Sequence, residues 1–386
     1  MWLGTDTLLS STNGEGHKSL RRKLLPAFYA RNTRELHPVF WRKAVQMCDA
    51  LHRIVAYNND RVLEVNLDGL IDRAALDVVG LAGLGVDFNT LDEPGGRLGK
   101  LHKDAFDLGK KELQVVLAAL LLPDWLFDRL PFQVYRDNRA GVQVLRAHCR
   151  EFIREDVASQ NAGEKNIVEM ASQLEHFSEN DLVDLSMDLL VAGHKTASSA
   201  LQLGFYMLAR HPEIQTRLRE EIRANMSGSP TPNVNVDKDL LYLNAVLNEL
   251  LRVYSPLASM TRLSSGAVEV SGQLIPSGSS AVVSQWAMNR CTALWGDDAA
   301  IFRPERWLEE GPKPLLLTFS KGPRSCIGEG FARKEVSVLL SAIVARFVLS
   351  MVQEDNDGRE KGVWEIQHGI TLKIKGGCRV GVKEIR

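Results

Sequence analysis

Apolar residues recur every three or four positions through much of the chain, a spacing that places them on one face of an α-helix. Six helices are expected, at residues 67–85, 133–160, 178–211, 213–224, 237–254 and 328–351. The third opens with the N-cap residue Ser178 and acids in its first turn, and it stops at Pro212. The sixth is predicted to be strongly amphipathic.

After Pro256 the pattern changes to short β-type runs separated by Gly, Ser and Pro. Strands are expected at residues 267–270 and 281–283, and a terminal ladder at residues 371–382 turns around Gly376 and Gly377. The sequence shows neither an internal repeat nor a low-complexity linker. We therefore predict a mainly α protein with small β-sheets (α+β), built as one domain over residues 1–386.

Composition and charge exclude several classes of protein. The 386 residues carry a net charge of -1, with 45% hydrophobic and 25% charged residues, as in ordinary globular proteins. Nucleic-acid binders usually have a basic excess, so no nucleic-acid partner is expected. The cysteines at positions 48, 149, 291, 326 and 378 include no CxxC pair. This spacing favours a reducing compartment and one functional thiol over a disulfide framework or a zinc site.

No segment has the pattern of a signal peptide or a membrane-spanning helix. The N-terminus lacks a basic stretch followed by an apolar core, and no run of about 18 apolar residues occurs. The longest apolar run, at residues 115–122, is interpreted as a buried helix end, with a membrane-dipping surface as the alternative.

The strongest chemical signal is the run FSKGPRSCIG at residues 319–328, directly before the sixth helix. Cys326 would lie at the helix N-terminus, where free N–H groups stabilise a thiolate. Gly322 and Gly328 allow close approach of a flat ligand. Arg324 can pair with a carboxylate, and Phe319 supplies an apolar wall beside the sulfur. A lone cysteine would be a buried structural residue, but this pattern favours a ligand-binding thiolate.

This run resembles the cysteine loop of the cytochrome P-450 superfamily. The resemblance implies heme b (iron protoporphyrin IX) with Cys326 as the axial ligand of the iron. It also implies O2 as a substrate and electrons from NADPH through an NADPH-cytochrome reductase. Further motifs of the family extend the resemblance over nearly the whole chain.

Two of these motifs carry charges. Glu249 and Arg252 stand three residues apart on one helix face, where they can form an ion pair. The run at residues 302–307 resembles the family's meander segment and implies that Arg306 joins them in a structural charge cluster. By the same resemblance, Arg262 binds a heme propionate.

The segment AGHKT at residues 192–196 resembles the part of the family that crosses the oxygen-binding face of the heme. The resemblance implies that Gly193 gives dioxygen room and that the Thr196 hydroxyl helps to deliver protons. His194 is expected to face away from the heme. Lys195 departs from the family, whose members usually carry an acid there. The reversed charge leaves efficient oxygen activation an open question.

His17 and Arg21 lie one helical turn apart and can both face an anion. In the family, residues at this spacing bind a heme propionate, but they lie well inside the chain. The resemblance therefore implies an N-terminal truncation that removes a membrane anchor, the first helices and part of the first sheet. The nearest pattern is that of fungal proteins of the endoplasmic reticulum membrane.

The resemblance also indicates a pocket and a partner surface. The expected pocket residues, mostly apolar, are Leu189, Ala192, Leu257, Ala258, Ile370 and Thr371. They suit a lipophilic small molecule such as a terpenoid, steroid or polyketide. A basic patch of Lys321, Arg333 and Lys334 would receive the reductase, and the protein is expected to be a monomer.

The predicted function is a heme-thiolate monooxygenase that inserts one oxygen atom of O2 into its substrate. Two alternatives stay open. One is a heme-thiolate enzyme that uses peroxide or isomerises an oxygenated substrate, for which Lys195 is the motive. The other is a non-catalytic, truncated heme-binding remnant.

Overall fold

The computed structural model describes residues 7–9, 14–56, 62–106, 133–159, 165–174, 177–225, 239–352 and 365–385. Its longer helices are α1 (Glu15–Leu24), α3 (His37–Val55), α4 (Asp68–Val78), α5 (Arg97–Phe106), α8 (Gln133–Ser159), α9 (Ile167–Leu174), α10 (Glu179–Arg210), α11 (Pro212–Asn225), α13 (Leu241–Val253) and α16 (Glu329–Arg346). Shorter helical segments are η1 (Leu25–Phe28), α2 (Ala30–Glu35), the π-helix η3 (Val79–Gly83), α14 (Gln285–Met288), α15 (Thr292–Trp295), η5 (Pro304–Trp307) and η6 (Gly322–Arg324).

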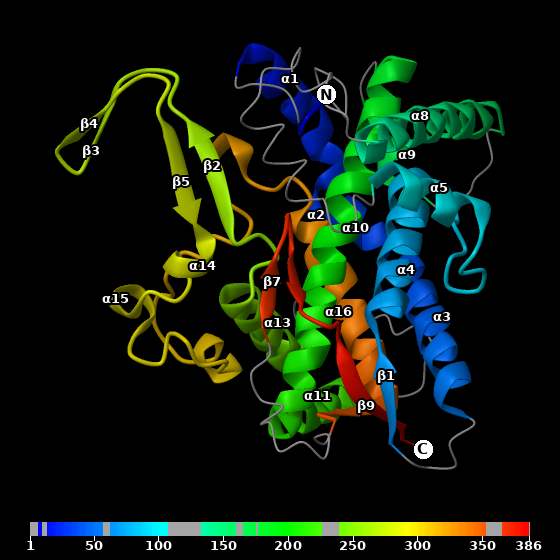
Figure 1. Cartoon of the computed structure of the whole chain (residues 1–386), viewed down its shortest axis with the longest axis vertical. Helices are drawn as coiled ribbons and strands as arrows, with labels where there is room; N and C mark the ends of the chain where they lie inside the picture. Colours follow the sequence, from blue (N-terminus) through cyan, green and yellow to red (C-terminus); the bar gives the residue numbers. More distant parts are fainter. Residues whose placement is uncertain are drawn as a thin grey trace.

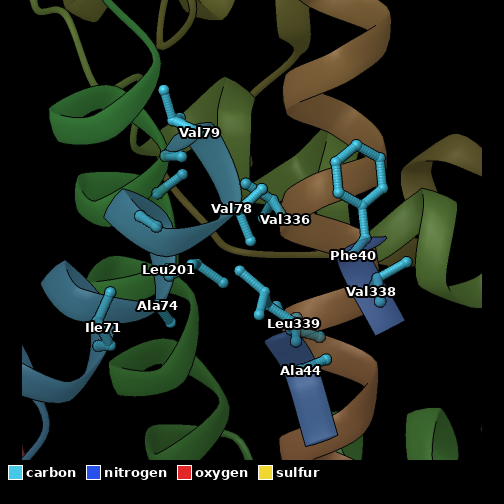
Figure 2. Packing of buried hydrophobic residues seen from close by; sticks show 14 of the residues in the cluster. Phe40, Ala44, Ile71, Ala74, Val78, Val79, Leu201, Val336, Val338 and Leu339 are labelled. Atoms are coloured by element: carbon cyan, nitrogen blue, oxygen red, sulfur yellow. The ribbon is translucent and has the colours of Figure 1, made fainter. Parts of the chain in front are cut away.

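The longest helix, α10, runs through the body of the molecule and packs against α4 and α16 (Figure 1). A capping box defines its start: the Ser178 hydroxyl accepts the N–H of Asp181, and the Asp181 carboxylate accepts the N–H of Ser178. Figure 2 shows the core that the four central helices share, with apolar side chains of α3, α4, α10 and α16 in mutual contact. The core therefore fixes the position of the middle of α10.

Within the described residues there are four small antiparallel sheets, and some of their strands contribute side chains to the same core. The strands are β1 (Leu63–Asn66), β2 (Ser259–Leu263), β3 (Val268–Val270), β4 (Gln273–Ile275), β5 (Ser280–Ser284), β6 (Phe347–Ser350), β7 (Ile366–His368), β8 (Leu372–Ile374) and β9 (Arg379–Glu384). One sheet has the order β1-β9-β6, and the others are the pairs β2-β5, β3-β4 and β7-β8. In Figure 1 the β3-β4 pair projects from the helical body. The predicted fold class, mainly α with small β-sheets, is confirmed.

Most predicted helices are present with nearly the expected bounds. The segment at residues 67–85 forms α4 and continues as the π-helix η3, and α8, α10 and α11 match their predictions. The helix predicted from residue 237 is observed as α13, beginning at Leu241; residues 237 and 238 lie outside the described part of the chain. Residues 115–122, the longest apolar run, also lie outside the described residues.

Two predictions about the C-terminal third are wrong. The helix expected at residues 328–351 ends at Arg346, because the next four residues form β6 and pair with β9. The ladder expected at residues 371–382 is divided between two sheets: β8 pairs with β7, whereas β9 lies between β1 and β6. Both errors arise because strand pairing depends on partners that are distant in the sequence.

The prediction that the sixth helix is strongly amphipathic is also wrong, because α16 is enclosed on nearly all sides by α3, α10, α11 and α13. Its buried residues include the acid Glu335, which is 0% exposed. Neither carboxyl oxygen of Glu335 has a hydrogen-bond partner within the described residues. Burial raises the pKa of this carboxyl well above its usual value of 4.5.

Because of Glu335, the stability of the folded protein should decrease as the pH rises. Between its unfolded pKa, near 4.5, and its raised folded pKa, the folded protein binds the extra proton. In that window the free energy of unfolding should fall by up to ~1.4 kcal/mol per pH unit. Urea unfolding of wild type and Glu335→Gln between pH 5 and 8 measures the difference. A matched control is Glu329→Gln, because Glu329 lies partly exposed on the same helix. Equal pH slopes for wild type and Glu335→Gln would contradict the assignment.

Candidate functional site

Cys326 lies in a short loop between η6 and the start of α16. The Cys326 N–H donates to the Phe319 carbonyl at 2.8 Å, and the Ser325 N–H donates to the Gly322 carbonyl at 2.9 Å. Gly322 has φ +81°, a left-handed conformation that glycine adopts without a Cβ clash. Cys326 alone of the five cysteines is exposed. The loop therefore presents one accessible thiol at the N-terminus of a long helix.

Opposing effects act on the Cys326 thiol. Protein atoms on its covered sides desolvate the sulfur and raise the pKa of the thiol, while the N–H of Gly328, hydrogen bonded to the sulfur, lowers it. The raising effect is the larger one. A bound metal cation would reverse this balance, because coordination removes the proton from a thiol. The site therefore fits a metal ligand better than a free nucleophilic thiolate.

Four basic side chains from three parts of the chain surround the loop: His17 and Arg21 of α1, Arg262 of β2, and Arg324 of the loop itself. Arg21 Nη2 donates to Ser325 Oγ at 3.0 Å. Arg262 Nη2 donates to Ser320 Oγ at 2.9 Å. The structure thus brings together the basic residues that were predicted to hold heme propionates, together with Cys326.

The three arginine side chains among them repel one another. Burial lowers the pKa of Arg324, and the charges of Arg262 and Arg21 lower it further. Burial also lowers the pKa of His17, with smaller effects of Arg324 and Arg21. A local excess of positive charge beside the thiol favours a ligand that carries carboxylates. The donor set, a thiol with guanidinium groups around it, fits a heme with its two propionates.

The middle of α10 carries a partly exposed strip that is followed by a buried stretch of the helix. Leu189, Gly193 and Thr196 are partly exposed, and Ala192 is exposed, whereas the helix is buried from residue 197 to residue 209. The Thr196 hydroxyl donates to the Ala192 carbonyl one turn earlier, at 2.6 Å. The strip therefore presents small and apolar groups beside one hydroxyl.

His194 lies on another face of α10. Its Nε2–H donates to the backbone carbonyl of Asp72 at 3.0 Å, and its ring meets the ring of His102 edge-on, with centroids 4.7 Å apart. Burial lowers the pKa of His194 well below its usual value. His194 is thus a neutral side chain held between helices, and it points away from the strip of Thr196.

Gly193 lies where α10 packs closely against a neighbouring element. A Cβ added at Gly193 would lie 2.8 Å from Val79 Cγ2, which is closer than real Cβ contacts allow. One α-hydrogen of Gly193 therefore faces η3, and the glycine permits close packing of α10 against that π-helix.

Lys195, the residue that departs from the family pattern, is paired. Its Nζ lies 3.2 Å from Asp72 Oδ2 of α4, and the Ser198 hydroxyl donates to the same carboxylate. The side chains of Lys195 and Asp72 are 39% and 37% exposed, so the pair contributes only about 0–1 kcal/mol to stability. The reversed charge of Lys195 is thus compensated by a carboxylate on the neighbouring helix.

The segments of the expected substrate pocket meet beside α10. Ser199 Oγ donates to the Leu372 carbonyl at 2.6 Å, and the Leu372 N–H donates to the Pro256 carbonyl at 2.8 Å. Next to these bonds, Leu257 and Ile370 are 36% and 51% exposed, and Ala258 is partly buried. Thr371, the remaining residue of this segment, is buried.

The charge cluster of Glu249, Arg252 and Arg306 is present. Arg252 donates twice to Glu249, from Nε and Nη2 at 2.8 Å each, and both side chains are 0% exposed. Arg306 Nε lies 3.4 Å from Glu249 Oε1. Sequence reasoning missed two further members: Asp298, 2.9 Å from Arg306 Nη1, and Trp307, whose Nε1–H donates to Glu249 at 2.9 Å. Trp307 lies within the recognised run at residues 302–307, which is a usable signal, whereas Asp298 lies outside any recognised motif.

The prediction that Lys321, Arg333 and Lys334 form a basic surface patch is wrong. Lys334 is buried, and its Nζ donates to Thr33 Oγ1 at 3.3 Å. Arg333 is engaged by Glu329, at 3.1 Å, and by Asn248 Oδ1, at 2.7 Å. Only Lys321 of the three is fully exposed. Helical spacing alone did not reveal that α16 turns Lys334 inward.

Within the described residues, no helix combines the length and apolar character needed to cross a membrane.

Comparison with known proteins agrees with this geometry. A family model for cytochrome P-450 matches residues 1–375. Cytochrome P-450 monooxygenase sphH of Aspergillus fumigatus is 34% identical, over 97% of this chain and 71% of the relative. Cytochrome P-450 monooxygenase FUM15 of Gibberella moniliformis is 31% identical, over 96% of this chain and 72% of the relative. The chain therefore belongs to the cytochrome P-450 superfamily and is an oxidoreductase of the monooxygenase type with fungal relatives.

Proposed function

We propose that this protein inserts one oxygen atom of O2 into a lipophilic small molecule, using heme b bound through Cys326. Electrons would come from NADPH through an NADPH-cytochrome reductase. The observation that carries the proposal is the single exposed cysteine at the N-terminus of α16, with three arginines and a histidine around its loop. Membership of the family supports heme iron, O2, a redox partner and a small-molecule substrate in general terms.

Each residue near the loop has a role in this proposal. Cys326 is the ligand of the iron, and a thiolate-ligated heme supplies the activation of dioxygen. Arg21, Arg262 and Arg324, with His17, hold the propionates. Phe319 shields the sulfur; the guanidinium of Arg333 lies 5.2 Å from the centre of its ring. With heme bound, this aromatic ring would help to keep water from the thiolate.

On the partly exposed strip of α10, Thr196 is proposed to hold a proton at Oγ1, where it would be available for the activation of dioxygen that a heme would supply. Its position on the partly exposed strip of α10 supports this role. Leu189, Ala192, Leu257 and Ile370 offer partly exposed or exposed apolar surface, which suits a terpenoid, steroid or polyketide. We further propose that the protein acts as a monomer at the endoplasmic reticulum membrane.

Isotope labelling separates this proposal from a peroxide-using or isomerising enzyme. With NADPH, reductase and 18O2, the product should gain one labelled oxygen atom. Turnover with peroxide but none with NADPH, reductase and O2, or a product without the label under 18O2, would contradict the proposal.

The proposed role of Thr196 predicts that its removal uncouples NADPH consumption from oxygen insertion into the substrate. Thr196→Ala should release several-fold more of the consumed NADPH electrons as hydrogen peroxide, because general acid assistance is typically worth about 100-fold or more. Thr196→Ser keeps the hydroxyl and is the matched control, which should stay near wild type. The ratio of peroxide formed to NADPH consumed is the measurement. An unchanged ratio in Thr196→Ala would remove Thr196 from proton delivery.

A further inference from the structure

We propose that Asp188 is a positioning residue of this site, tying the α10 strip to the cysteine loop through the turn at residues 7–9. The inference rests on the proposed function, because its effect is to hold Arg324 where it can bind a propionate. Asp188 lies on α10 directly before Leu189 and one turn before Ala192. Residues 7–9 form a short turn, the N-terminal turn.

The first half of the tie joins α10 to the N-terminal turn. Asp188 Oδ2 accepts the N–H of Leu9 at 3.2 Å, and the carboxylate also accepts hydrogen bonds from the Thr7 hydroxyl and the Leu8 N–H. Thr7, Leu8 and Asp188 are all buried, with exposures of 1%, 9% and 6%. Three donors from one short turn therefore converge on a single buried carboxylate.

The second half joins the turn to the cysteine loop. Arg324 Nη1 donates to the Leu8 carbonyl at 3.0 Å. Arg262 and Arg21 repel Arg324, as the lowering of its pKa indicates. The Leu8 carbonyl is an acceptor that opposes this repulsion. Without the turn, Arg324 would lose this acceptor and move away from the other cations.

The surroundings of Asp188 explain why an acid is buried there. Burial raises the pKa of Asp188 to about 6, and Asp184 one turn earlier adds to the rise, while the three donors lower it. Asp184 is itself paired with Arg146 of α8. A leucine would fill the same space without this cost. The role that an acid adds here is to accept hydrogen bonds from the turn.

Asp188 Oδ1 has no hydrogen-bond partner within the described residues, so a variant can change this atom without removing the acceptor at Oδ2. Asp188→Asn can place its NH2 group at the Oδ1 position and keep a carbonyl oxygen at the Oδ2 position for the three donors. Asp188→Leu removes both acceptors at similar volume. The proposal therefore predicts that Asp188→Asn largely keeps the contact with the N-terminal turn and that Asp188→Leu loses it.

Two readouts test the tie in the full chain. Hydrogen–deuterium exchange at the Leu8 and Leu9 amides of the heme-free protein should accelerate about tenfold or more in Asp188→Leu and change little in Asp188→Asn. Heme transfer from the loaded protein to excess apomyoglobin should accelerate on the order of tenfold in Asp188→Leu only. Asp184→Asn is the matched control, because its carboxylate lies on the same helix and pairs with Arg146; it should change neither rate.

Each outcome decides the proposal. Unchanged amide exchange in Asp188→Leu overturns the tie, and faster exchange with unchanged heme transfer overturns the positioning of Arg324. If Asp188→Leu does not fold, Thr7→Val removes one donor from the opposite side. It should accelerate exchange at Leu8 and Leu9 several-fold, and unchanged exchange there overturns the tie. Failure of the wild type to bind heme through Cys326 overturns the proposed function and with it the positioning of Arg324. The exchange measurement still decides the tie, because it needs no heme.

Discussion

Replacing Arg252 with methionine is expected to lower the free energy of unfolding by about 3–5 kcal/mol. The Glu249 carboxylate is 0% exposed, and Arg252 supplies both of its 2.8 Å guanidinium contacts. Without Arg252, the nearest remaining cation is Arg306, at 3.4 Å from Glu249 Oε1, so the buried carboxylate is only partly compensated and methionine cannot stabilise it. Arg252 also donates to the carbonyls of Asn289 and Ala299, at 2.6 Å each. These carbonyls would lose a donor as well.

Urea unfolding at pH 7 measures this loss. The matched control is Arg154→Gln, which breaks an exposed pair with Glu179 and should cost below about 1 kcal/mol. The double variant Glu249→Met with Arg252→Met should lose less than the sum of its single variants, because no uncompensated charge is left from the pair. A loss below about 1 kcal/mol in Arg252→Met would show that the cluster does not stabilise the fold.

Local patterns predicted the long helices well. The Ser178 capping box and Pro212 mark the two ends of α10 in a few neighbouring residues, and the observed helix follows them. The spacing of Glu249 and Arg252 likewise predicted a contact within one helical turn. Such features depend on residues three or four apart, so the sequence alone specifies them.

Features that depend on distant partners were not predictable in this way. β6 is a strand because it pairs with β9, and Lys334 is buried because α2 and α3 cover that face of α16. Gly193 likewise has its close neighbour, Val79, on another element. Propensity and helical spacing carry no information about these contacts.

The candidate site likewise has a part that neighbouring residues specify and a part that depends on distant residues. The cysteine loop is contiguous, so residues 319–328 could be interpreted together. The resemblance to a family added the distant basic residues. The tie through Leu8 joins positions 316 residues apart, and no motif marks Asp188. Only the packed structure shows that this acid, the N-terminal turn and Arg324 form one chain of contacts.

Replacing Cys326 with alanine is expected to abolish thiolate ligation of the heme completely. Within the chain Cys326 is the one exposed cysteine, and its sulfur receives the N–H of Gly328 at the start of α16. Alanine offers no metal-binding atom. Because the four basic side chains remain, residual heme binding in Cys326→Ala would be electrostatic and would lack the thiolate. Cys291→Ala is the matched control, because Cys291 is partly exposed and lies far from this loop in the sequence.

The ferrous–carbon monoxide absorption spectrum of the protein expressed with heme tests this central claim most directly. A strongly red-shifted Soret band in wild type and Cys291→Ala, lost in Cys326→Ala, is the result that we predict. A red-shifted band that survives in Cys326→Ala, or its absence from wild-type protein loaded with heme, would contradict ligation by Cys326.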